Sequence, residues 1–217
     1  MAKKDTQLSV VGKRQPRLDG PLKATGRSQF ADDVVLPGML HGKIVRSSIP
    51  RGRIVSLDTS RAEKLPGVKA VITHQDTNSM MYGSDQFLLS DDRVNCFGDE
   101  IAAVAAVDED TAWEAAELIR VEYEPLPSVF SVEDAAAEGA PLLHEYNENN
   151  FADDLSMNFG DGEKAFSEAQ HIRTDRYTVH PSHSCFSEHH TVLADYSIPD
   201  QLTIWTPIQA SIHIQMN

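Results

Sequence analysis

A run of seven apolar residues, Ile101 to Val107, constrains the fold of this 217-residue chain most strongly. The run has no polar face, so it predicts a strand that is buried on both sides. Asp108 to Ile119 is predicted as a helix, and Val121 to Glu124 alternates like a half-buried strand that ends at Pro125. This succession predicts a βαβ-like unit, with a right-handed crossover if its strands pair in parallel.

A second alternation of strands and a helix precedes this unit. Leu40 to Ile49 and Arg53 to Leu57 have the composition of strands, and Asp58 to Lys64 has that of a short helix. Leu65-Pro66-Gly67 stops the helix, because proline breaks the backbone hydrogen-bond ladder and glycine tolerates the reversal. Val68 to Thr73 is then predicted as a buried strand. Helices and short strands that alternate in this way predict an α/β (α+β) fold with a mixed sheet and flanking helices.

A long polar stretch, His74 to Asp92, separates these two units and carries Met80, Met81, Tyr82 and Phe87. Loops of this length are usually functional or mobile. The methionines and aromatic residues fit a substrate pocket or a partner surface. They fit equally well the packing of an irregular core beneath the loop, because methionine fills such gaps.

The second half of the chain begins with a change in composition. Leu142 to Phe159 is rich in Asn, Asp and Glu and poor in apolar residues, which is typical of an interdomain linker. Asp161 to Gln170 is predicted as a helix and His171 to Val179 as a strand. His189 to Tyr196 and Gln201 to Thr206 are predicted to form a hairpin.

The charge and the cysteines exclude several classes of function. A net charge of −14 disfavours binding to nucleic acids and to anionic membranes. The two cysteines, Cys96 and Cys185, cannot hold an iron–sulfur cluster by themselves, and they predict no disulfide framework. The first residues lack the apolar stretch of a signal peptide. These features together predict a cytoplasmic protein.

Few residues form a recognisable chemical motif. The chain has no glycine-rich phosphate-binding loop, which disfavours nucleotide or flavin binding by this chain alone. Five histidines lie between positions 171 and 190 around Cys185, but their spacing matches no common zinc pattern, so ordinary strand and turn positions are favoured. Glu188 fits a buried structural carboxylate. The paired acids, such as Asp32-Asp33, lack the pattern of a calcium loop.

Four sequence segments, in a fixed order, resemble the molybdenum-binding subunit of the xanthine dehydrogenase and aldehyde oxidase family. The segment with the most distinctive ending extends from Gly98 through Ile101 and ends in Tyr123-Glu124-Pro125-Leu126-Pro127. The others are the glycine- and proline-punctuated opening from Val11 to Ser48, the helix-stop-strand segment from Leu65 to Thr73, and the segment Leu202 to Gln209. Together they extend over nearly the whole chain.

The resemblance implies a domain order and a chemistry. Residues 1–140 would form an N-terminal arm and a hammerhead-like α/β domain, 141–160 a linker, and 161–217 part of a molybdopterin-binding α+β domain. The family hydroxylates or dehydrogenates aromatic heterocycles or aldehydes, and members similar to the 4-hydroxybenzoyl-CoA reductase alpha subunit reduce an aromatic acyl-CoA. The implied cofactor is molybdopterin with molybdenum, bound mostly by residues outside this chain, while iron–sulfur clusters and FAD would sit on other subunits.

Gln209 is the one position that the resemblance assigns to the cofactor. It matches the family's glutamine, whose side-chain amide can donate a hydrogen bond to an oxygen ligand of molybdenum without adding charge. No residue of the chain is expected to be catalytic or to ligate a metal. Ser187 and His189 depart from the family, which commonly has methionine and proline around the glutamate matched by Glu188. The family's glycine-rich loop and its late catalytic glutamate have no counterpart before Asn217.

Two interpretations of the function therefore stay open. In the first, the chain is the N-terminal portion of a molybdenum-cofactor oxidoreductase subunit, either truncated or naturally split, which is incomplete by itself. Its partners would be the rest of that subunit or a second polypeptide, iron–sulfur and flavin subunits, and further copies in a homo-oligomer. In the second, the chain is a non-catalytic docking or dimerisation module that uses an apolar face or the Met80 to Phe87 loop.

Overall fold

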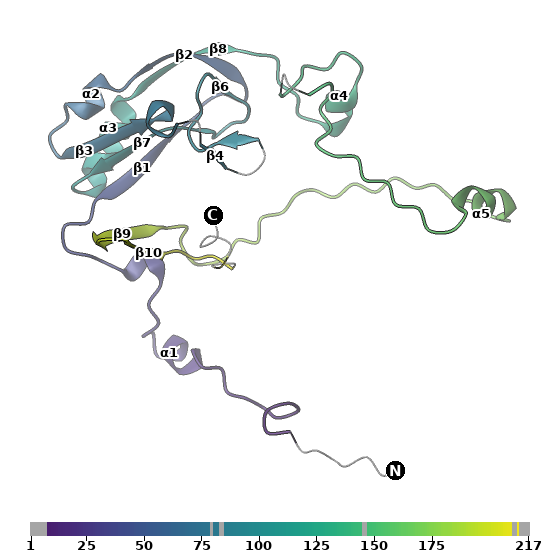
Figure 1. The fold of residues 1–217 in the computed structure, drawn as a ribbon, viewed down its shortest axis with the longest axis horizontal. Coiled ribbons are helices and arrows are strands. Elements are labelled where there is room, and N and C mark those ends of the chain that lie inside the picture. The colour runs from purple at the N-terminus through teal and green to yellow at the C-terminus, as the bar shows by residue number, and fades with distance from the viewer. Residues whose placement is uncertain (1–7, 79, 83–84, 145–146, 210–211, 213–217) are drawn as a thin grey trace. The chain divides into compact units, whose positions relative to one another are not determined.

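The computed structural model describes residues 8–78, 80–82, 85–144, 147–209 and 212. The chain divides into two compact units. One is continuous and comprises Gly38–Tyr177, and the other combines Met1–Pro37 with Thr178–Asn217. The mixed α and β content confirms the predicted fold class (Figure 1).

The Gly38–Tyr177 unit is built on two antiparallel sheets of three strands. Strand β7 lies at the centre of the first sheet, between β1 and β3. Strand β2 lies at the centre of the second sheet, between β6 and β8. The bounds are β1 His41–Arg46, β2 Gly52–Asp58, β3 Val68–Thr73, β6 Arg93–Val94, β7 Glu100–Ala106 and β8 Arg120–Pro125.

Helix α3, Glu109–Leu118, covers one face of the first sheet. It begins at Asp108, whose side chain accepts a hydrogen bond from the Thr111 N–H at 2.8 Å, as an N-cap residue does. Lys43 on β1 fastens the helix to the sheet, since its Nζ lies 4.2 Å from the centre of the Trp113 ring and 3.0 Å from Glu109 Oε1. The helix is thereby held against β1 and β7.

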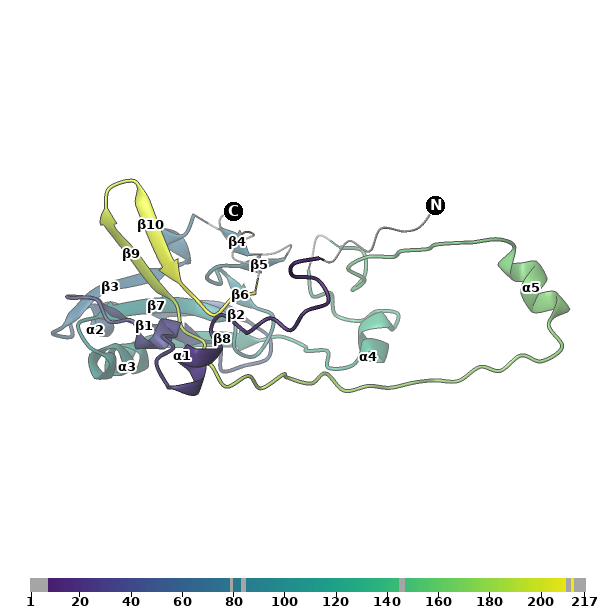
Figure 2. The ribbon, with the colours of Figure 1, turned by 90° about the horizontal axis from the view of Figure 1, so that it is seen from below.

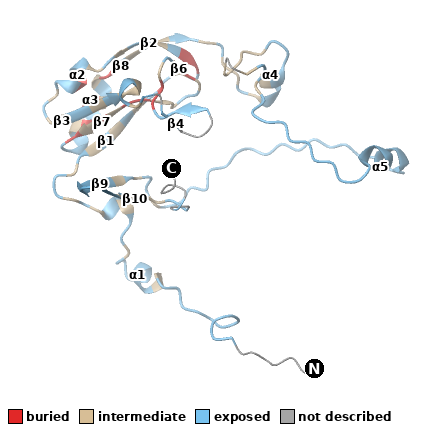
Figure 3. Ribbon diagram, viewed as in Figure 1, coloured by how far each residue is buried: buried red, intermediate tan, exposed pale blue. Residues whose placement is uncertain are grey.

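The core lies between this helix, the short helix α2 (Ser60–Glu63) and the sheet. Burial is greatest on β7, where Ile101, Ala102 and Ala106 are fully buried and Val104 is nearly so. Figure 3 shows that the buried segments of the described chain lie in this unit. The cluster on the helix side comprises Ala62, Ala102, Val104, Ala115 and Ile119. The predicted strand is confirmed, but burial on both sides is not: the helix-facing residues Ala102, Val104 and Ala106 are buried, whereas Ala103 and Ala105 on the opposite face are only half-buried.

Three sequence expectations differ from the structure. Strands β7 and β8 flank α3 as expected, but they lie in different sheets, and β8 pairs antiparallel with β2. The condition for a parallel βαβ crossover is therefore not met. Strand β3 forms at the expected residues but is only half-buried, because one of its faces is not covered by a helix. His171 to Val179 is extended and forms no strand.

The polar stretch between the two alternating units forms regular structure in two places. It contains a two-stranded hairpin, β4 (Met81–Tyr82) with β5 (Gln86–Phe87). A short 3-10 turn, His74–Asp76, precedes it. After β8 the chain continues through two short helices, α4 (Val132–Ala136) and α5 (Gly162–Glu168).

The other unit combines an N-terminal arm with a C-terminal hairpin. The arm carries helix α1, Gly20–Ala24, and a 3-10 turn at Ala31–Asp33. The hairpin pairs β9, Leu193–Ile198, with β10, Gln201–Trp205, in antiparallel register (Figure 2). Within this unit, His189 Nδ1 lies 2.7 Å from Asp32 Oδ2. The predicted hairpin is confirmed, although its first strand begins four residues later than expected.

Candidate functional site

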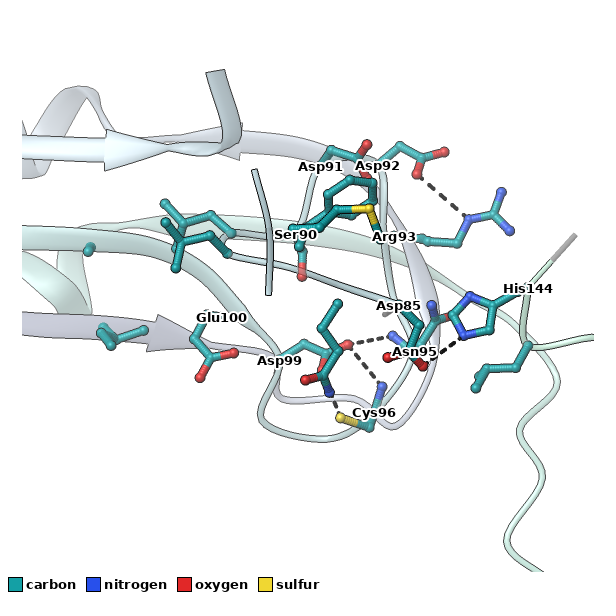
Figure 4. Close-up of a pocket in the computed structure, with 18 of the residues that line it drawn as sticks. Asp85, Ser90, Asp91, Asp92, Arg93, Asn95, Cys96, Asp99, Glu100 and His144 are labelled. Carbon is teal, nitrogen blue, oxygen red and sulfur yellow. Dashed lines mark hydrogen bonds and ion pairs between the residues drawn. The ribbon is translucent and has the colours of Figure 1, made fainter. Parts of the chain in front are cut away.

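A cavity of about 760 Å³ opens on the face of the first sheet that α3 does not cover. Its floor is a row of three apolar residues, one from each strand. Ala103 on β7 lies between Ile44 on β1 and Ile72 on β3, as the strand register requires. Figure 4 shows the polar residues that surround this floor. A space of this size is within the range of ligand-binding cavities.

The β4–β5 hairpin supplies an apolar wall of the cavity. Met81, Phe87 and Leu88 all line it and remain between 37% and 49% exposed. The Leu88 N–H donates to the Met80 carbonyl at 2.8 Å, which holds the end of the hairpin. These side chains thus form a surface around an open cavity, so the alternative of core packing beneath a loop is wrong for Met81 and Phe87.

Asp99 organises the turn at the polar end of the cavity. Its Oδ2 accepts hydrogen bonds from the Asn95 and Cys96 N–H groups at 2.6 and 3.0 Å, and its Oδ1 accepts from Cys96 Sγ at 2.7 Å (Figure 4). An aspartate that accepts from backbone N–H groups a few residues away is a common turn-forming arrangement. Asp99 therefore positions the Cys96 thiol at the cavity wall.

The environment of Cys96 keeps its thiol neutral. Burial raises the pKa of Cys96 to about 11, and the hydrogen bond to the Asp99 carboxylate together with the charges of Asp99 and Glu100 acts in the same direction. The thiolate is the nucleophilic form of cysteine. Cys96 is therefore a structural thiol and not a nucleophile at neutral pH.

This thiol gives a direct prediction for alkylation. Both cysteines are exposed, so the difference lies in the raised pKa of Cys96: we expect iodoacetamide at pH 8 to modify Cys185 well before Cys96, with the rate at Cys96 rising about tenfold per pH unit up to about pH 11. Asp99→Asn should accelerate the reaction at Cys96, since it removes a negative charge that disfavours the thiolate. Mass spectrometry of the two cysteine peptides measures both rates, and equal rates at pH 8 would contradict the assignment.

Carboxylates dominate the rim of the cavity. The described lining residues include Asp85, Asp91, Asp92, Asp99 and Glu100, opposed by Arg93 and His144. Several of these acids already have partners. Asp85 Oδ2 lies 3.2 Å from His144 Nε2, Asp92 Oδ1 lies 3.7 Å from Arg93 Nε, and Glu100 Oε1 lies 2.6 Å from Arg46 Nη1. The rim therefore has an excess of negative charge, but its carboxylates do not converge on one point.

Arg51 fastens the segment that supplies His144 to the cavity wall. This buried side chain donates from Nη1 to the Pro127 carbonyl at 2.9 Å and from Nη2 to the Leu142 carbonyl. Asn150 supports the same segment, because its Oδ1 accepts from the Leu143 N–H at 2.8 Å. Sequence patterns did not indicate Arg51, Asp99 or Asn150, since their hydrogen bonds are visible only after folding.

Gln209, the residue assigned to the cofactor by resemblance, belongs to the other unit and does not line this cavity. It follows β10 by four positions, and its side chain is exposed. An exposed neutral amide is chemically suited to donate one hydrogen bond to an oxygen ligand of a metal. The exposed amide of Gln209 is therefore chemically compatible with the predicted contact, which stays a prediction.

The histidines do not converge into a metal site. His183, Phe186 and His190 form a cluster of rings, with centroid distances of 6.0 Å (His183–Phe186), 4.5 Å (Phe186–His190) and 6.4 Å (His183–His190). Glu188 is only half-buried. Among the described residues, no group of three or more His, Cys, Asp or Glu side chains is placed to hold a metal ion. No helix in the described part of the chain combines the length and apolar composition needed to cross a membrane.

Comparison with known domain families gives two matches, in the order expected from the sequence. Residues 25–127 match the a/b hammerhead domain of aldehyde oxidase and xanthine dehydrogenase. Residues 143–217 match the molybdopterin cofactor-binding domain.

Individual relatives agree with these matches. The nicotinate dehydrogenase large molybdopterin subunit of Eubacterium barkeri is 35% identical over 199 residues, which are 90% of this chain and 46% of that protein. The carbon monoxide dehydrogenase large chain of Afipia carboxidovorans is 33% identical over 230 aligned positions, which cover 96% of this chain and 28% of that protein. The chain therefore spans less than half the length of these curated relatives.

Solved structures show the same relationship. A Cu,Mo-CO dehydrogenase in its carbon monoxide reduced state aligns with a TM-score of 0.59 and 41% identity, covering 62% of this chain and 18% of that one. Quinoline 2-oxidoreductase from Pseudomonas putida 86 aligns with a TM-score of 0.57 and 34% identity, covering 61% and 18%. The chain therefore belongs to the xanthine dehydrogenase and aldehyde oxidase family and corresponds to part of its molybdenum-binding subunit.

Proposed function

We propose that the chain is the N-terminal portion of the catalytic subunit of a cytoplasmic molybdenum-cofactor oxidoreductase and acts only within a completed subunit. The observation that carries this proposal is the succession of a hammerhead domain and a cofactor-binding domain on one chain. The reaction class is hydroxylation or dehydrogenation of an aromatic heterocycle or aldehyde, or reduction of an aromatic acyl-CoA. Residues 1–140 would build the arm and hammerhead-like domain, 141–160 the linker, and 161–217 part of the cofactor domain.

The contribution of this chain to the chemistry is limited to support of the cofactor. When bound, the molybdenum cofactor supplies the two-electron chemistry by which a water-derived oxygen is added to the substrate. The amide of Gln209 would hold and orient an oxygen ligand of the metal, and a neutral donor does so without changing the charge beside it. Electrons would leave through iron–sulfur clusters, and in some assemblies FAD, on other subunits.

The remaining part of the site can come from the same polypeptide or from another one. The aligned segment makes up 46% of the nicotinate dehydrogenase protein but 28% of the carbon monoxide dehydrogenase large chain. Molybdopterin subunits of this family therefore differ widely in length. This difference supports a division of the site between two polypeptides as readily as a longer single chain.

Metal analysis tests the proposal. The chain should be co-expressed with its neighbouring genes and purified by a tag, and molybdenum in the complex should then be measured against protein. We expect stoichiometric molybdenum in the complex and none in the isolated chain. A complex that assembles without molybdenum would favour the alternative, a non-catalytic docking or dimerisation module.

Substitution of Gln209 tests its assigned role. Gln209→Ala should lower the turnover of the assembled complex by about 10- to 100-fold while its subunit composition stays unchanged, as is typical for residues that orient the ligands of a metal. Gln201→Ala is the matched control, because Gln201 is also an exposed glutamine of the same unit, at the start of β10, eight residues before Gln209. Equal turnover in the two variants would remove Gln209 from the site.

A further inference from the structure

The floor of the cavity is an apolar sheet face that lacks the polar residues expected in contact with water. A sheet with one solvated face usually alternates apolar and polar residues. Here the exposed face carries Ile44, Ala103 and Ile72 side by side, and the two isoleucines are 49% and 40% exposed. On the opposite face, α3 covers the same strands.

The β4–β5 hairpin extends this apolar surface. Met81, Phe87 and Leu88 line the same cavity as the sheet residues and add one aromatic and two flexible aliphatic side chains. We call these six residues the open face: Ile44, Ile72, Met81, Phe87, Leu88 and Ala103. A contiguous exposed apolar surface of this kind, with a polar rim, is typical of a protein interaction site.

The charge of the rim limits what can occupy the open face. Five carboxylates border the cavity against Arg93 and His144, so an approaching segment with arginine or lysine at its edge is favoured. A second copy of this chain is disfavoured, because each copy carries a net charge of −14. Several rim carboxylates already have internal partners, so they supply a negative field and not a set of converging ligands for a small molecule.

We propose that the open face docks a segment of the part of the molybdenum subunit that this chain does not contain, and that this segment carries apolar side chains flanked by arginine or lysine. The proposal rests on the function proposed above and names the surface through which the catalytic protein is completed. The relatives supply the occupant, since the aligned segment makes up only 46% of the nicotinate dehydrogenase protein and 28% of the carbon monoxide dehydrogenase large chain. Apolar contact would supply affinity, and the acidic rim would select the partner.

Photo-crosslinking from the floor of the cavity tests the proposal. A benzophenone amino acid is placed at Ile72 in the tagged full-length chain, which is co-expressed with its neighbouring genes, purified as a complex and irradiated. We expect the crosslinked peptide to belong to the remaining part of the molybdenum subunit and to contain arginine or lysine. The same probe at Val132, which is 81% exposed on α4 and lies outside the cavity, is the control and should not crosslink to that peptide.

The outcomes separate this proposal from the one on function. Crosslinks to an iron–sulfur or flavin subunit or to a second copy, or no crosslink from position 72 in an intact complex that contains molybdenum, would overturn the docking proposal alone. An intact complex without molybdenum would overturn the proposed function. Crosslinks of equal yield from positions 72 and 132 to the same peptide would show that the open face is not selective and would also overturn the docking proposal.

Charge substitution gives a second, quantitative test. Ile72→Lys should weaken association with the remaining part of the subunit by about 100-fold, because it places an unpaired charge in an apolar contact. Val132→Lys should leave association unchanged. Circular dichroism of the isolated variants confirms folding, which a lysine at the half-exposed position 72 permits. Unchanged association of a folded Ile72→Lys variant would overturn the proposal.

Discussion

Ile101→Ala is expected to lower the free energy of unfolding of the chain by about 3 kcal/mol, because it leaves a cavity where a fully buried side chain stood. Ile101 is among the largest side chains with no exposed surface, and it lies on the central strand β7. Urea denaturation followed by circular dichroism measures the change. The loss follows from removing side-chain carbon atoms that the surrounding sheet cannot replace.

Ile72→Ala is the matched control for this prediction. It makes the same chemical change in the same sheet, but Ile72 is 40% exposed on the open face. Its cost should be about 1 kcal/mol, since much of that side chain already contacts water. If the two variants lose equal stability, Ile101 does not occupy the closed core that the structure describes.

Arg51→Met is expected to cost about 2–3 kcal/mol, because the Pro127 and Leu142 carbonyls lose a charged hydrogen-bond donor in a buried place. Methionine keeps much of the apolar stem of the side chain, so the change reports mainly on the hydrogen bonds. Hydrogen exchange should also show faster exchange at the Leu143 amide, whose segment Arg51 holds. Denaturation and exchange together separate a local loss from a global one.

Arg53→Met is the control for Arg51. Arg53 lies two residues along the chain on β2, is exposed, and approaches Glu124 only at 4.0 Å. A surface ion pair of this kind contributes little, so the change should stay within about 0.5 kcal/mol. If both variants lose a similar free energy of unfolding, Arg51 stabilises the fold through its positive charge alone and not through hydrogen bonds to the two carbonyls.

The secondary structure of the hammerhead region followed from local patterns, whereas the pairing of its strands did not. The apolar run at 101–107 correctly predicted a buried strand, and Asp108 correctly marked the start of a helix. An apolar run indicates burial but does not specify a neighbour, so the antiparallel pairing of β8 with β2 was not predictable from it. His171 to Val179 was predicted as a strand, yet a strand forms only where another strand is available to pair with it.

The candidate site could be predicted only in part. Met81 and Phe87 were singled out because methionine and aromatic residues cluster within an otherwise polar stretch, and they do line the cavity. Arg51 did not stand out, because its two acceptors lie 76 and 91 residues further along the chain. Contacts over such sequence distances leave no local signal. The role of Gln209 rests on resemblance, and it stays a prediction until the variant is measured.

The neutral thiol of Cys96 makes the cavity wall resistant to oxidation. Peroxide attacks the thiolate form of cysteine, and a pKa of about 11 leaves only about one thiol in ten thousand ionised at pH 7. Oxidation to a sulfenic or sulfinic acid would add a polar, bulkier group to the cavity wall. Because Asp99 and burial suppress the reactive form, the wall keeps its original shape and polarity in an oxidising environment.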